Sequence, residues 1–129
     1  MQTVTLKERL DLERPVITVG TFDGVHLGHR GVLRKVQEEA ASRKGTSVVV
    51  TFDPHPRKII EPDAATGVLT SLSEKQWRIE SAEMEVLAVV PFTQELRNLT
   101  PEAFAERYLV EYLDVSAVVL GYDHGFGKG

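Results

Sequence analysis

The sequence predicts an α/β protein in which a parallel sheet is covered by helices on both faces. Four short apolar runs rich in β-branched residues lie at 16–19, 47–52, 86–90 and 117–120, and none alternates cleanly with polar residues. Runs of this kind are typical of strands buried on both faces of a parallel sheet. Helical patterns separate the runs, and this alternation favours right-handed crossover connections.

The first helical pattern follows the run at 16–19 and extends to about Arg43. Gly45 lies just beyond and is expected to stop the helix, since glycine is common after the last helical residue. One face of this helix carries the apolar residues, which are Val32, Leu33, Val36 and Ala40.

Two further helices are expected from their starting signals. One begins near Ser71, where Glu74 three residues later suggests a capping box. The other begins at Thr100, a typical N-cap residue, with Pro101 at the first helical position. Its apolar face consists of Phe104, Tyr108, Leu109 and Tyr112.

Composition narrows the class of protein. A chain of 129 residues is long enough for one domain with a core, and its net charge of -4 gives no basic footprint for nucleic acid. The absence of cysteine excludes disulfides and thiolate metal sites. The segment 1–8 lacks the apolar core of a signal peptide, and no apolar run approaches the ~20 residues of a membrane helix. We therefore expect a cytoplasmic protein without nucleic-acid or membrane partners.

The run at 20–29, Gly-Thr-Phe-Asp-Gly-Val-His-Leu-Gly-His, joins the first predicted strand to the first predicted helix. Free N–H groups and the dipole at a helix N-terminus attract anions, and glycines let the backbone approach a ligand. His26 and His29 add donors at the same place. The turn therefore predicts a phosphate site.

Other interpretations of this turn are less favoured. Its glycines are spaced by four residues, so they do not match the Gly-x-Gly-x-x-Gly fingerprint of dinucleotide-binding proteins. His26 and His29 have no evident third ligand nearby, which argues against a preformed metal site. Two incidental histidines at a helix start remain an alternative to the phosphate site.

Two other segments leave from the carboxyl ends of predicted strands, where ligands bind in open α/β sheets. Asp53 directly follows the second run and begins a loop containing three prolines. Its carboxylate suits a ribose hydroxyl or magnesium, or it caps the turn. The glycine-rich tail at 121–129 contains Asp123 and Phe126, and the phenyl ring suits stacking on a planar group. A flexible tail is the alternative there.

These motifs resemble the bacterial FAD synthetase family within the His-x-Gly-His nucleotidyltransferase superfamily. The resemblance implies a Rossmann-like, doubly wound parallel sheet of the nucleotidyltransferase type. It covers nearly the whole chain in order, through the segments 20–29 (GTFDGVHLGH), 51–58 (TFDPHPRK), 69–75 (LTSLSEK), 91–93 (PFT), 99–104 (LTPEAF), 121–123 (GYD) and 126–127 (FG).

The resemblance implies transfer of AMP from ATP to FMN, giving FAD and pyrophosphate, with Mg²⁺ arriving on ATP rather than in a preformed protein site. His26 and His29 would be the catalytic residues that bind the triphosphate. The residues implied for the ATP phosphates are Gly20, Thr21, Phe22, Asp23 and Gly28. The candidates for flavin, ribose or magnesium contacts are Phe52, Asp53, Pro54, Asp123 and Phe126.

The sequence departs from the family pattern at two places. Gly125 stands where many members have arginine. The family continues past Gly129, so residues 1–129 are expected to be the N-terminal part of the adenylyltransferase domain, truncated at its C-terminus. A riboflavin kinase domain would belong to a longer parent protein. The alternatives are a nucleotidyltransferase with a different acceptor and an inactive fragment that binds nucleotide or flavin.

Overall fold

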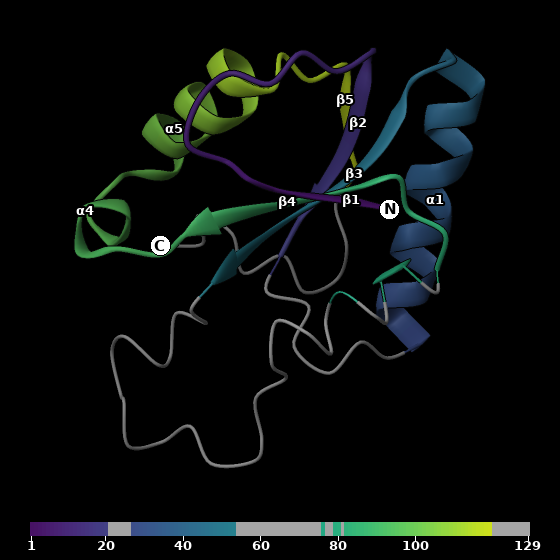
Figure 1. Ribbon diagram of the computed structural model, residues 1–129, viewed down its shortest axis with the longest axis horizontal. Coiled ribbons are helices and arrows are strands. Elements are labelled where there is room, and N and C mark those ends of the chain that lie inside the picture. The colour runs from purple at the N-terminus through teal and green to yellow at the C-terminus, as the bar shows by residue number, and fades with distance from the viewer. Residues whose placement is uncertain (21–26, 54–75, 77–78, 81, 120–129) are drawn as a thin grey trace.

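A computed structural model describes residues 1–20, 27–53, 76, 79–80 and 82–119. In these residues a five-stranded sheet has the order β1-β4-β3-β2-β5, and every neighbouring pair of strands is parallel (Figure 1). The strands are β1 (Gln2–Thr5), β2 (Pro15–Val19), β3 (Thr46–Asp53), β4 (Val86–Pro91) and β5 (Ala117–Val118).

The sheet is buried on both faces, as the unbroken apolar runs predict. Successive side chains of a strand point to opposite faces. On β3, Val48 and Val50 belong to one core cluster, and Val49 between them belongs to another. On β4, Ala88 belongs to the cluster of Val48 and Val50, and its neighbour Leu87 belongs to the other cluster. Helices must therefore cover both faces.

Helix α1 (Leu27–Arg43) covers one face, which we call the α1 side (Figure 1). Three residues of its predicted apolar face are buried there against the strands, whereas Val32 is half-buried. The buried three are Leu33, Val36 and Ala40. Ile79 and Met84, which precede β4, complete this cluster.

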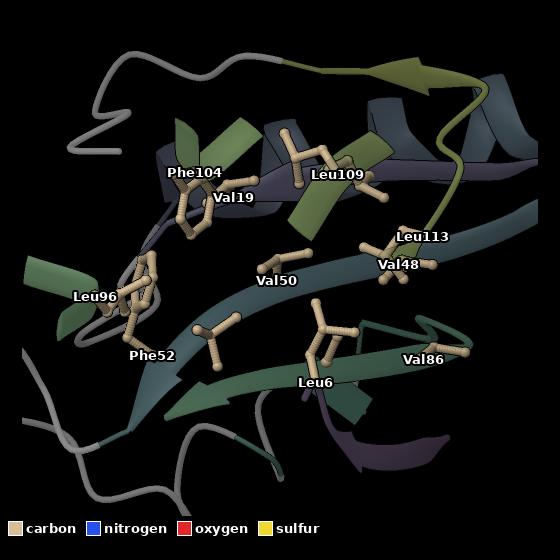
Figure 2. Packing of buried hydrophobic residues seen from close by; sticks show 13 residues of the cluster. Leu6, Val19, Val48, Val50, Phe52, Val86, Leu96, Phe104, Leu109 and Leu113 are labelled. Atoms are coloured by element: carbon tan, nitrogen blue, oxygen red, sulfur yellow. The ribbon is translucent and has the colours of Figure 1, made fainter. Parts of the chain in front are cut away.

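The opposite face, the α5 side, is covered by α4 (Gln94–Arg97), α5 (Pro101–Phe104) and the π-helical segment η2 (Ala105–Tyr112) (Figure 1). The predicted N-cap is confirmed, because the Thr100 hydroxyl accepts the Ala103 N–H at 3.0 Å. Figure 2 shows the buried residues that these elements bring against the sheet, namely Leu96, Phe104 and Leu109, together with Leu113 directly after η2.

The predicted helix after Thr100 continues as η2, whose π-helical geometry the sequence pattern did not indicate. Phe104 and Leu109, five residues apart, are both buried against the sheet. Tyr108 and Tyr112 are half-buried; Tyr108 stacks on Phe104 with ring centroids 5.0 Å apart. The wider π-helical turn suits this five-residue spacing.

All four predicted strands are confirmed, although the last is shorter than expected: β5 ends at Val118, and Leu120 lies outside the described residues. Strand β1 was not predicted. Its side chains are exposed except for half-buried Val4, because β1 is an edge strand that pairs only with β4. Helix α4 was also not predicted, since its four residues are too few for a periodic pattern.

The end of α1 differs in detail from the prediction. The residue with left-handed backbone is Lys44, with φ of 56°, and not Gly45. Lys44 N–H donates to Ala41 O at 3.2 Å and Gly45 N–H to Ala40 O at 2.7 Å, which is a Schellman motif. The predicted capping box at Ser71 and Glu74 lies outside the described residues.

Candidate functional site

The strands of a parallel sheet end at one edge, and there the described part of the candidate site lies. Gly20 directly follows β2, and its N–H donates to Val50 O at 3.0 Å. The pairing of β2 with β3 therefore continues up to the residue at which the glycine-rich turn begins. Asp53, the last residue of β3, lies beside Pro91, the last residue of β4.

The order of connections places a switch point at β2. From β2 the chain passes through α1 to β3, on the α1 side. From β4 it passes through α4, α5 and η2 on the α5 side and returns as β5 next to β2 (Figure 1). Ligands of open α/β sheets bind beyond the carboxyl ends of strands at such a switch point. Gly20 lies at this position.

The predicted strand–turn–helix arrangement is confirmed at both of its ends. β2 ends at Val19, and α1 begins at Leu27, so Gly28 and His29 lie in the first helical turn. Free backbone N–H groups are present in such a turn. The remaining predicted residues of this turn, Thr21, Phe22, Asp23 and His26, lie outside the described residues, as does the side chain of His29.

Asp53 is half-buried and shares the α1 side with Val49, since alternate residues of β3 point to the same face. Its backbone oxygen accepts the Phe92 N–H at 3.2 Å, which fixes the end of β3 against the residue after β4. The carboxylate therefore lies on the side of the sheet from which α1 begins.

Phe52 lies on the opposite face from Asp53. Its side chain is 8 % exposed and belongs to the α5-side core, as Figure 2 shows. The ring contacts Phe92 edge to face at a centroid distance of 5.9 Å and Phe104 at 5.8 Å. The pleat of β3 thus separates two neighbouring residues that the sequence had grouped in one site. Half-buried Phe92 directly follows β4; it was part of the family-like segment 91–93 but was not proposed as a site residue.

The other flavin-side candidates, Pro54, Asp123 and Phe126, lie outside the described residues. Within the described ranges, no three histidine, aspartate or glutamate side chains lie together in a way that could hold a metal ion. No helix in the described part of the chain is long and apolar enough to span a membrane.

The sheet order, and the glycine-rich sequence that separates β2 from α1 at the switch point, define an α/β domain of the class that binds ligands at the carboxyl ends of its strands. The sequence model of the FAD synthetase family matches residues 8–129. The chain belongs to this FAD synthetase family.

The relatives carry two activities in their names. The chain is 36% identical over 126 residues to the bifunctional riboflavin kinase/FMN adenylyltransferase of Listeria monocytogenes, covering 97% of this chain and 40% of the relative. It is 36% identical over 116 residues to the protein of that name from Bacillus subtilis, covering 89% of this chain and 36% of the relative. The chain thus spans about two fifths of the length of these relatives.

A solved structure shows the same fold. The chain superposes on a protein described as a macrolide-efflux protein from Streptococcus pneumoniae with a TM-score of 0.75. The match covers 96% of this chain and 52% of that protein at 23% identity. At this identity the likeness supports the fold of the chain and nothing about its activity.

Proposed function

We propose that this chain carries the FMN adenylyltransferase activity of FAD biosynthesis. In this reaction a phosphate oxygen of FMN attacks the α-phosphorus of ATP, the bond to the pyrophosphate group breaks, and FAD and pyrophosphate form. The family match over residues 8–129 is the observation that carries the proposal. The switch point at the end of β2, followed by a helix N-terminus, supports it because both features favour a bound phosphate.

The proposed catalytic residues are His26 and His29, which would donate to the triphosphate and stabilise the charge that grows on the departing pyrophosphate. Catalysis would then depend on positioning and charge neutralisation, without a covalent enzyme intermediate. The described backbone supports this role for His29 by placing it in the first turn of α1. The proposed phosphate-binding residues are Gly20, Thr21, Phe22, Asp23 and Gly28.

Asp53 is the best described candidate on the acceptor side. Its half-buried carboxylate at the end of β3 suits a ribose hydroxyl, the flavin or Mg²⁺, since carboxylate oxygens are common magnesium ligands. Mg²⁺ would neutralise phosphate charge and would arrive with ATP. Pro54, Asp123 and Phe126 remain proposed residues for contacts with flavin, ribose or magnesium. Phe52 is a further candidate, and it would contribute to this part of the site from within the α5-side core.

An acceptor assay tests this function. The chain is incubated with labelled ATP and magnesium, together with FMN, nicotinamide mononucleotide or phosphopantetheine, and labelled products are separated. If the chain carries this activity, FAD forms and the other two acceptors remain unchanged. Transfer to another acceptor would instead support a different nucleotidyltransferase. Binding of ATP or FMN without pyrophosphate release would support the binding-only alternative.

Riboflavin phosphorylation, the second activity in the names of the relatives, is proposed to reside outside these 129 residues. The support is that the FAD synthetase model already occupies residues 8–129. We therefore expect no conversion of riboflavin to FMN by this chain in a coupled chromatographic assay. The cytoplasmic location stays a prediction from the sequence.

A further inference from the structure

Helix α1 has an unusual distribution of charge. Its N-terminal half carries three exposed cations, Arg30, Arg34 and Lys35, and no acidic residue stands in its first turn. The acidic residues of the helix, Glu38 and Glu39, come only afterwards. Anions stabilise a helix near its N-terminus, so Arg30, a cation in the first turn, is placed against the helix dipole, whereas Arg34 and Lys35 lie beyond the turn in which the dipole acts.

The two halves of α1 also differ in their pairing. In the C-terminal half, Arg43 Nε lies 3.2 Å from Glu39 Oε1, a favourable pair four residues apart. In the N-terminal half, Arg30 and Arg34 are four residues apart with like charge, which is destabilising. Among the residues that the structure describes, neither of these two arginines nor Lys35 forms an ion pair.

We call Arg30, Arg34 and Lys35 the basic segment. Glu38 and Glu39 follow Arg34 and Lys35 by four residues, but no ion pair between them is formed in the described part of the chain, so helix stability explains little of this segment. Departures from local stability rules are expected at functional sites. Arg30 of this segment lies in the first turn of α1, at the helix end where the proposed function places the phosphates of ATP. Arg34 is seven residues from the start of the helix, or roughly 10 Å at 1.5 Å per residue. This distance is close to the Debye length of ~8–10 Å at physiological ionic strength.

We propose that the basic segment of α1 steers anionic nucleotides to the site through long-range attraction, with Arg34 and Lys35 acting without direct contact. This inference rests on the proposed function. The chain as a whole has a net charge of -4, so its average electrostatic potential repels anionic polyphosphate substrates. Cations beside the site make the electrostatic potential there positive. Such patches raise the association rate of anionic ligands, and added salt weakens the effect.

The test is the association rate of a ribose-labelled fluorescent ATP, measured by stopped flow at increasing KCl. The variant is Arg34→Gln combined with Lys35→Gln, because glutamine keeps the helix propensity and removes the charge. We expect the rate to fall about 3- to 10-fold at low salt and the difference to shrink below about 2-fold at ~0.5 M KCl.

The matched control is Lys44→Gln, which removes an exposed cation just beyond the other end of the helix. Lys44 is 14 residues from Arg30, or roughly 20 Å along the axis, so we expect the rate to stay at the wild-type value. Adding Arg30→Gln should lower the association rate further and raise Tm relative to the double variant by about 1–4 °C, because the unfavourable interaction of this cation with the helix dipole disappears.

Three results would overturn the inference. The association rate of the double variant could equal that of the wild type at low salt, or its lower association rate could persist at high salt. Its Tm could also fall enough that partial unfolding accounts for the lower rate. If the wild-type chain itself fails to bind the labelled ATP, the proposed function fails and this inference fails with it. If the wild type binds and the double variant matches it, only the inference fails.

Discussion

Gly45 and the carbonyl oxygen of Arg14 approach so closely that a Cβ atom on residue 45 would lie 2.1 Å from that oxygen. The contact joins the end of α1 to the residue before β2, and both partners are backbone, so neither moves easily. Gly45→Ala is therefore expected to destabilise the fold by about 1–3 kcal/mol, the usual cost of overpacking. Urea unfolding followed by circular dichroism measures this change.

Gly31→Ala is the matched control, since a Cβ atom there meets nothing within 4 Å and the residue lies exposed within α1. Alanine is the better helix former, so this variant is expected to gain about 0.5–1 kcal/mol. Equal stability changes in the two variants would show that the approach to Arg14 does not decide the choice of glycine at 45.

His29→Ala is expected to lower FAD formation by two to three orders of magnitude, about the effect of removing one well-placed donor to a developing charge. Binding of FMN should change little, because the histidine is proposed to face the ATP phosphates. Pyrophosphate release and FMN titration measure the two effects separately. His26→Ala should act in the same direction, and a few-fold loss only would contradict the phosphate role.

Asp53→Asn distinguishes between the roles left open for this carboxylate. If it binds Mg²⁺, FAD formation should fall at low magnesium and recover partly as magnesium is raised, since the amide keeps one oxygen ligand. If it binds ribose or flavin, the KM for ATP or FMN should rise at every magnesium concentration. Wild-type kinetics under all conditions would remove Asp53 from the site.

Burial raises the pKa of Tyr108 above its ordinary value of 10.0, the neighbouring Tyr112 adds to the shift, and Arg107 opposes it. The phenol therefore ionises less readily in the folded state than in the unfolded state. Its contribution to stability is present below pH 10 and is lost as the pH rises through the folded pKa. Between about pH 9 and 11, the wild type should lose more stability than Tyr108→Phe. Parallel unfolding curves for the two proteins would contradict this expectation.

Much of the sheet could be predicted because its central strands are buried on both faces. The apolar runs that became β2, β3 and β4 contain enough β-branched residues to stand out from any helical pattern. Strand β1 does not bury its side chains in this way, and its place in the sheet comes from hydrogen bonding to β4, more than eighty residues later in the chain. A local sequence pattern cannot indicate a partner strand that is so distant in the chain.

The sequence predicted at which edge of the sheet the candidate site lies, but it did not predict which side chains contact one another there. The pattern around the glycine-rich run predicted that a strand ends before it and that a helix follows it, and β2 and α1 confirm both. Phe52 and Asp53 were grouped because they are adjacent in sequence, although the period-two alternation of a strand already implied opposite faces. The packing of Phe52 against Phe92 depends on the register of β3 with β4, which a single sequence does not reveal.

The pairing of Gln2 with Val86 in adjacent strands has a consequence for synthesis of the chain. Residues at the N-terminal end leave the ribosome first, yet β1 has no partner until β4 has emerged roughly 85 residues later. At about 5–20 residues per second, this wait lasts roughly 4–17 s. During that time β2 and β3 can already pair across α1. The edge strand should therefore join last, and ribosome-stalled chains that end before β4 should expose β1 to protease.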